Sequence, residues 1–72
     1  MPYLHFNYGD MKQSQFWREV HIAMKQKLNM VLIREGNGRA LANSVRRYAN
    51  DHGIPALVKQ RIGTDIVLVT FL

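Results

Sequence analysis

The chain has 72 residues, of which ten are Lys or Arg, five are Asp or Glu and none is Cys, so its formal net charge is +5. This length gives room for one domain, residues 1–72, with a single small core. The absence of Cys excludes a disulfide framework and a zinc site built on thiolates. The first residues lack the basic and apolar regions of a secretory signal, and no apolar run approaches the roughly 20 residues that span a bilayer, so we expect a cytoplasmic protein.

The first two predicted elements are a strand and a long helix. Residues 2–8 alternate between apolar and polar side chains, which predicts a strand with its even-numbered residues facing inward. Asp10, followed three residues later by Gln13, matches a helix N-cap and a capping box. The helix is expected to run from residue 11 to residue 28, before Asn29, with a core face formed by Phe16, Trp17, Val20, Ala23, Met24 and Leu28.

A second strand and a second helix follow. The continuous apolar run at residues 30–33 is rich in β-branched side chains, which suits a central strand covered on both sides. The next helix is predicted over residues 38–52, with Asn37 as its cap and with Gly53 and Pro55 ending it. Its apolar side chains recur at helical spacing, so its buried face is expected to consist of Leu41, Val45, Tyr48 and His52.

The last 18 residues predict a β-hairpin. Strands at residues 56–62 and 65–72 are joined by Gly63-Thr64, which is typical of a two-residue type II′ turn and places Val58 opposite Val69. The element order is then β-α-β-α-β-β, which predicts an α+β fold with one mixed four-stranded sheet and both helices on one face. A winged helix is the alternative, because that fold also ends in a hairpin.

The clearest functional pattern is a stripe on the exposed side of the second predicted helix. Arg and Asn are donors suited to phosphate oxygens and base edges, and no acidic residue interrupts the stripe. An ordinary solvated helix face, the alternative interpretation, more often contains Glu to pair with Arg. We therefore expect nucleic-acid contacts from Arg39, Asn43, Arg46 and Asn50, with Arg47 beside them. Arg46 is expected to be free of structural contacts, so its truncation should leave the fold intact.

Two further basic features accompany this stripe. Residues 36–39, Gly-Asn-Gly-Arg, join a strand to a helix N-terminus, where exposed N–H groups favour an anion. A turn that simply needs positive φ angles is the alternative. Lys59 and Arg61 precede the hairpin turn and form a basic arm suited to a nucleic-acid groove, or else a charged edge that prevents aggregation.

The sequence offers little for catalysis. His5, His21 and His52 lack the spacing of a metal-binding pair, and the five acidic residues form no acid–base pair, so we expect no enzyme activity, metal or cofactor. Phe16 and Trp17 are about 100° apart on their helix and are expected to face the sheet, although a Trp at the edge of such a face can anchor a partner.

The segment Ile33-Arg34-Glu35-Gly36-Asn37-Gly38-Arg39-Ala40-Leu41 resembles the strand, Gly-Arg-Ala turn and second helix of the Alba family of small basic DNA- and RNA-binding proteins. The order β-α-β-α-β-β is similar to that of this family, and also to the sporulation protein S family and the C-terminal domain of translation initiation factor 3. The resemblance implies a dimer that contacts nucleic acid through the first loop, the turn and the last hairpin. It places Lys12 near the first loop, Arg39 in the turn, and Lys59 and Arg61 on the hairpin.

These patterns together predict a small non-enzymatic protein that binds the phosphate backbone of DNA or RNA with low sequence specificity. We expect a homodimer that uses the hairpin or the first helix, and no membrane partner. The alternative is a protein-interaction module, such as a small inhibitor or adaptor. It rests on Ile66 and Leu68, which share one predicted hairpin face with Lys59 and Arg61.

Overall fold

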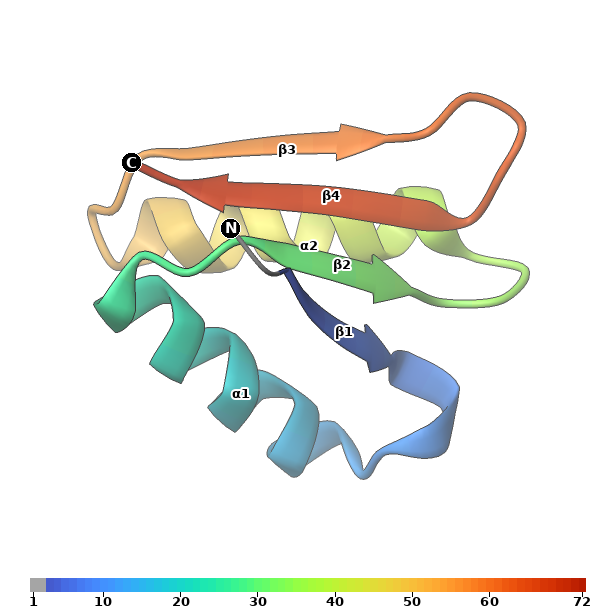
Figure 1. Ribbon diagram of the computed structural model, residues 1–72, viewed down its shortest axis with the longest axis horizontal. Helices are drawn as coiled ribbons and strands as arrows, with labels where there is room; N and C mark the ends of the chain where they lie inside the picture. The colour runs from blue at the N-terminus through green and yellow to red at the C-terminus, as the bar shows by residue number, and fades with distance from the viewer. Residues whose placement is uncertain (1–2) are drawn as a thin grey trace.

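A computed structural model describes residues 3–72 and shows an α+β fold with the predicted element order (Figure 1). A winged helix is not needed to account for the chain. Residue 2, the predicted start of the first strand, lies outside the described residues. The elements are β1 (Leu4–Asn7), the 3-10 turn η1 (Tyr8–Asp10), α1 (Gln13–Gln26), β2 (Met30–Ile33), α2 (Gly38–Asp51), β3 (Ala56–Gln60) and β4 (Ile66–Phe71).

The four strands form one mixed sheet in the order β1-β2-β4-β3. β1 and β2 are parallel, and β4 is antiparallel to both of its neighbours, so β3 runs in the same direction as β2. Each helix must therefore return from the carboxyl end of one strand to the start of the next. As a result each helix begins beyond the carboxyl end of the strand that precedes it, and the hairpin turn lies at the same end of the strands as the start of α2 (Figure 1).

The core lies between the sheet and the two helices. Alternate strand residues point into it, and the predicted register is confirmed, with Val58 opposite Val69 and Ala56 opposite Phe71. Within residues 3–72 no buried side-chain polar atom lacks a hydrogen-bond partner. No helix in this part of the chain is long and apolar enough to cross a membrane. The buried residues are Phe16, Val20, Ala23, Met24, Met30, Leu32, Leu41, Ala42, Val45, Ala49, Val58, Val67, Val69 and Phe71.

The first helix is shorter than predicted at both ends. The predicted cap, Asp10, lies in η1, because the side chain of Asn7 accepts the N–H of the residue two positions later and turns the chain there. The helix begins after Lys12, which makes no side-chain capping bond. It ends at Lys27, whose φ of 56° is left-handed, so Leu28 leaves the predicted core face and is 37% exposed.

The buried face of α2 is rotated from the predicted one. Ala42 and Ala49 are buried, whereas Tyr48 is half-buried and His52 is exposed. α2 packs over β3 and β4, and small side chains allow this close approach. The larger Tyr48 ring turns to the flank that faces α1, and His52 follows the last helical residue, where its Nδ1 atom lies 2.8 Å from the Tyr48 carbonyl.

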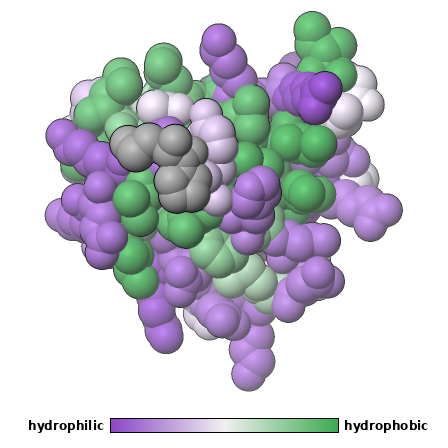
Figure 2. All heavy atoms as spheres, in the orientation of Figure 1, coloured by the Kyte–Doolittle hydropathy of each residue, from purple (hydrophilic) through white to green (hydrophobic). Residues whose placement is uncertain are grey.

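The central strand β2 is covered on one side only, contrary to the prediction, because both helices lie on the same face of the sheet. Met30 and Leu32 are buried, but Val31 and Ile33 are half-buried on the open face. There they pair across the sheet with residues 68 and 66 of β4. Figure 2 shows hydrophobic atoms reaching the surface over the sheet, interrupted and rimmed by hydrophilic side chains.

The hairpin turn is displaced by one residue from the predicted type II′ turn. The N–H of Thr64 donates to the Arg61 carbonyl at 3.1 Å, and Gly63 occupies the third position with a φ of 76°, as a type II turn requires. The Thr64 hydroxyl donates to the same carbonyl and accepts the N–H of Ile66. These bonds leave Asp65 outside the strand pairing.

Asp65 attaches this turn to the start of α2. Its carboxylate accepts the N–H of Gly36 at 2.8 Å and the N–H of Gly38 at 3.0 Å. These two bonds, first the one from Gly38 and then the one from Gly36, lower the pKa of Asp65 below its ordinary value of 3.8. The approach is so close that a Cβ on Gly38 would lie 2.6 Å from the Cα of Asp65, so this position requires glycine.

We expect Gly38→Ala to lower the free energy of unfolding by about 1 to 3 kcal/mol, because a backbone must move to admit the methyl group. Helix propensity alone predicts the opposite sign, since Ala is the better helix former. Gly9→Ala is the matched control, because a Cβ there meets only Asn7 Oδ1, at 3.5 Å. Urea unfolding of both variants provides the measurement, and equal stability of the two would contradict the close contact.

Candidate nucleic-acid interface

The predicted stripe on α2 divides into two rows in the structure. All of its residues are exposed. Residues four apart are displaced by about 40° around a helix, so the row Arg39, Asn43 and Arg47 turns gradually toward one side. Asn43 and Arg47 line a groove beside α1, whereas Arg46 and Asn50 line a second hollow toward β3.

Arg46 is not the free surface residue that the sequence predicted. Its guanidinium donates to the Asn43 side-chain oxygen and to the backbone carbonyl of Val58, each at 2.9 Å. Val58 belongs to β3, an edge strand whose outward carbonyls have no partner strand. Arg46 therefore ties α2 to the sheet edge and is already bonded within the fold.

The predicted anion site at residues 36–39 is also occupied within the chain. The N–H groups of Gly36 and Gly38, which a phosphate would need, both donate to Asp65. Asn37, the predicted cap, makes no side-chain capping bond. The carboxylate that satisfies the helix N-terminus is thus supplied from the hairpin, 27 residues away from Gly38 in sequence.

The other predicted basic residues are spread over the molecule. Lys59 pairs with Leu68 on the open face of the sheet, and alternation along β3 separates it from α2, which covers the opposite face. Arg61 follows β3 at the base of the turn, and its N–H donates to the Ile66 carbonyl at 2.9 Å. Lys12 is exposed and directly precedes α1, on the other helix from Arg39.

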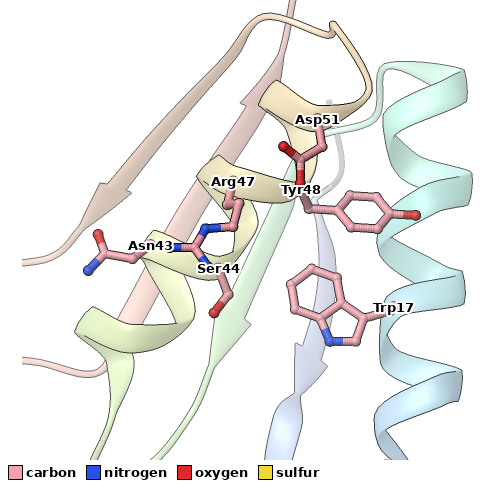
Figure 3. A pocket seen from close by; sticks show the side chains of 6 residues that line it. All are labelled: Trp17, Asn43, Ser44, Arg47, Tyr48 and Asp51. Carbon is pink, nitrogen blue, oxygen red and sulfur yellow. The ribbon is translucent and has the colours of Figure 1, made fainter.

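The groove beside the row Arg39, Asn43 and Arg47 separates the two helices. Trp17 of α1 is half-buried, packs against the core and also lines this groove, and its indole stacks on Tyr48 with ring centroids 5.1 Å apart. The α2 wall consists mostly of polar side chains, as Figure 3 shows. The groove has a volume of about 240 Å³ and is lined by Trp17, Asn43, Ser44, Arg47, Tyr48 and Asp51.

Tyr48 forms part of the wall of this groove, whereas its spacing in the sequence predicted a buried core residue. Its hydroxyl lies 2.9 Å from His21 Nδ1, and its ring packs against His52 at 4.4 Å between centroids. The sequence contains one indication that Tyr48 is not in the core. Ser44, Arg47 and Asp51 lie on the same side of the helix as Tyr48, and all three are polar. Within residues 3–72 no three His, Asp or Glu side chains come together as a metal site requires.

We expect Arg46→Ala to lower the free energy of unfolding by about 1 kcal/mol, because it removes two hydrogen bonds and leaves the Val58 carbonyl without its partner. For a chain of this size that loss lowers Tm by roughly 4 to 8 °C. Arg47→Ala should change stability by less than about 0.5 kcal/mol, because the exposed side chain of Arg47 makes no hydrogen bond within residues 3–72. Thermal unfolding of the two variants tests the assignment, and a reversed order would show that Arg47 is the structural residue.

Comparison of the chain with models of protein families, with curated proteins and with solved structures gives no match. The function is therefore argued from the geometry of the row Arg39, Asn43 and Arg47 and of the groove beside it.

Proposed function

We propose that this chain is a small non-enzymatic protein that binds DNA or RNA through the outer face of α2, with low sequence specificity. The observation that carries the proposal is the row Arg39, Asn43 and Arg47, three exposed side chains without a buried structural role. Within residues 3–72 neither guanidinium of this row has a carboxylate oxygen within 4.0 Å. Both charges therefore remain available to phosphates.

The length and direction of the row suit a nucleic-acid backbone. Eight residues separate Arg39 from Arg47, which corresponds to about 12 Å along the helix. Lys12 adds an exposed positive charge directly before α1. A net charge of +5 attracts a polyanion from a distance, and phosphate contacts then hold it without reading its sequence.

The resemblance of residues 33–41 to the Alba family supports the same proposal. Arg39 lies within that segment, and the structure leaves it exposed at the start of α2. Lys59 and Arg61, the hairpin residues implied by the resemblance, lie on or beside the other face of the sheet. They are therefore not part of the α2 surface, and the proposal assigns the principal contacts to Arg39 and Arg47.

The open face of the sheet favours an interaction with protein as well. Leu57 is 53% exposed and Leu68 is 41% exposed, and half-buried Val31, Ile33 and Ile66 continue the apolar surface. No helix of the described residues covers this face. We propose that a second copy of the chain covers it, so that the homodimer carries its two α2 helices on opposite outer surfaces. A different protein in this place corresponds to the inhibitor or adaptor alternative.

The nucleic-acid proposal predicts the salt dependence of binding. Each phosphate contact contributes about 0.9 to the slope of log K against log salt on duplex DNA. Arg39→Ala combined with Arg47→Ala should therefore reduce that slope by about 2 for each protomer and weaken binding to all sequences. Fluorescence anisotropy of a labelled duplex at several salt concentrations measures both quantities.

A control pair separates this surface from net charge. Arg18→Ala combined with Lys25→Ala removes the same charge from exposed positions on α1. We expect this pair to leave most of the slope unchanged. Equal losses for the two pairs would show that only net charge matters, and no binding to DNA or RNA at low salt would refute the proposed function.

The dimer proposal predicts different outcomes for two surface variants. Leu68→Lys places a second cation beside Lys59 on the open face and should convert the protein to a monomer. Ile22→Lys changes an exposed residue of α1 and should leave the dimer intact. Analytical ultracentrifugation distinguishes these outcomes. A wild-type monomer up to millimolar concentration would exclude the dimer, and dissociation by Ile22→Lys alone would place the interface on α1.

A further inference from the structure

We infer that the groove between α1 and α2 binds one unpaired base of a single-stranded nucleic acid, while the flanking phosphates lie along Arg39, Asn43 and Arg47. This inference rests on the proposed function and specifies the form of nucleic acid that the protein prefers. It is carried by the lining of the groove, by its size and by the distribution of charge along it.

The aromatic part of the groove comes from Trp17. Tyr48 packs on the indole at an interplanar angle of 28°, and Phe16 meets it edge-on at 90°, so the ring is held in a fixed orientation. Its indole nitrogen points away from Tyr48 in Figure 3 and donates no hydrogen bond within residues 3–72. A nucleobase has a flat π face that can stack on the indole and ring-edge acceptors for the indole N–H.

The polar part of the groove comes from α2. Where two helices pack side by side, apolar residues ordinarily fill the space between them. At the positions that face Trp17, α2 instead carries Asn43, Ser44 and Arg47, and a groove remains between the helices. Amide, hydroxyl and guanidinium groups match the edges of a base and the adjoining phosphate. The volume of about 240 Å³ is below the roughly 300 to 1,000 Å³ of pockets for larger ligands, so it admits a single ring system.

The charges along α2 determine where the phosphates of the bound strand are favoured. Asp51 is the last residue of α2 and repels phosphate, whereas Arg39 near the N-terminus of α2 and Arg47, one turn before Asp51, attract it. A base within a duplex is paired and stacked, and cannot enter a recess between two helices without being unpaired. The groove therefore favours single strands, whereas the row of basic residues by itself serves any backbone.

Trp17 is the only Trp in the chain, so its fluorescence reports directly on the groove. The protein is titrated at low salt with a 12-nucleotide single strand, with the matching duplex and with a mononucleotide. We expect saturable quenching by the single strand, little quenching by the duplex although it binds, and much weaker binding of the mononucleotide, because it lacks the flanking phosphates.

Ser44→Phe tests the groove without touching Trp17, since Ser44 is exposed and its substitution fills the recess from α2. It should weaken single-strand binding by about tenfold, as expected for the loss of one stacked base, and leave duplex binding unchanged. Gln15→Phe adds the same side chain to an exposed position of α1 outside the groove and should change neither affinity. Thermal unfolding confirms that both variants fold.

Three results would overturn the inference. They are unchanged Trp17 fluorescence at saturation with the single strand, wild-type single-strand affinity of Ser44→Phe, and saturation by the mononucleotide at the same concentration as the single strand. The last result would identify a site for free nucleotides. Failure of the proposed function is different, because the wild-type protein would then bind neither single strand nor duplex.

Discussion

The carboxylate of Asp65 holds the hairpin turn against the start of α2, and the placement of α2 on the sheet depends on this contact. It accepts the N–H of Gly38, which a helix start leaves without a partner, and the N–H of Gly36, two residues before the helix. It also requires the bare backbone of Gly38, because the two chain segments nearly touch. β4 begins at the next residue, Ile66. The same contact therefore positions α2 relative to β4, which lies between β2 and β3 in the sheet.

The residues on different sides of α2 make different contacts. Leu41 and Val45 face the core, and Arg46 reaches the carbonyl of Val58 at the sheet edge. Arg47 turns the other way, toward Trp17 of α1. Adjacent arginines in the sequence thus differ: the Arg46 side chain is hydrogen-bonded within the fold, whereas the Arg47 side chain makes no hydrogen bond within residues 3–72. Net charge by itself does not distinguish them.

Much of the fold could be predicted because its signals are local. Apolar spacing identified both helices and all four strands, and the hairpin register placed Val58 opposite Val69 as observed. Several of the errors occur at element ends, where competing local bonds decide the outcome. Asp10 has the chemistry of a cap, but Asn7 turns the chain before the helix begins. Likewise Tyr48 has the spacing of a core residue, but the small residues of α2 are the ones that fit against the sheet.

The sequence by itself determined the element order, the register of the last hairpin and a basic outer face on α2, because each depends on patterns that are local in the sequence. Only the tertiary structure decided which basic residues remain free. In the structure, the Asp65 carboxylate occupies the predicted anion site, Arg46 is hydrogen-bonded to β3, and Lys59 lies on the opposite face of the sheet from α2. The tertiary structure also opened the groove at Trp17, which lies between two helices. The physical reason is that hydrogen-bond partners and cavities arise between segments distant in sequence, and no pattern along one segment specifies them.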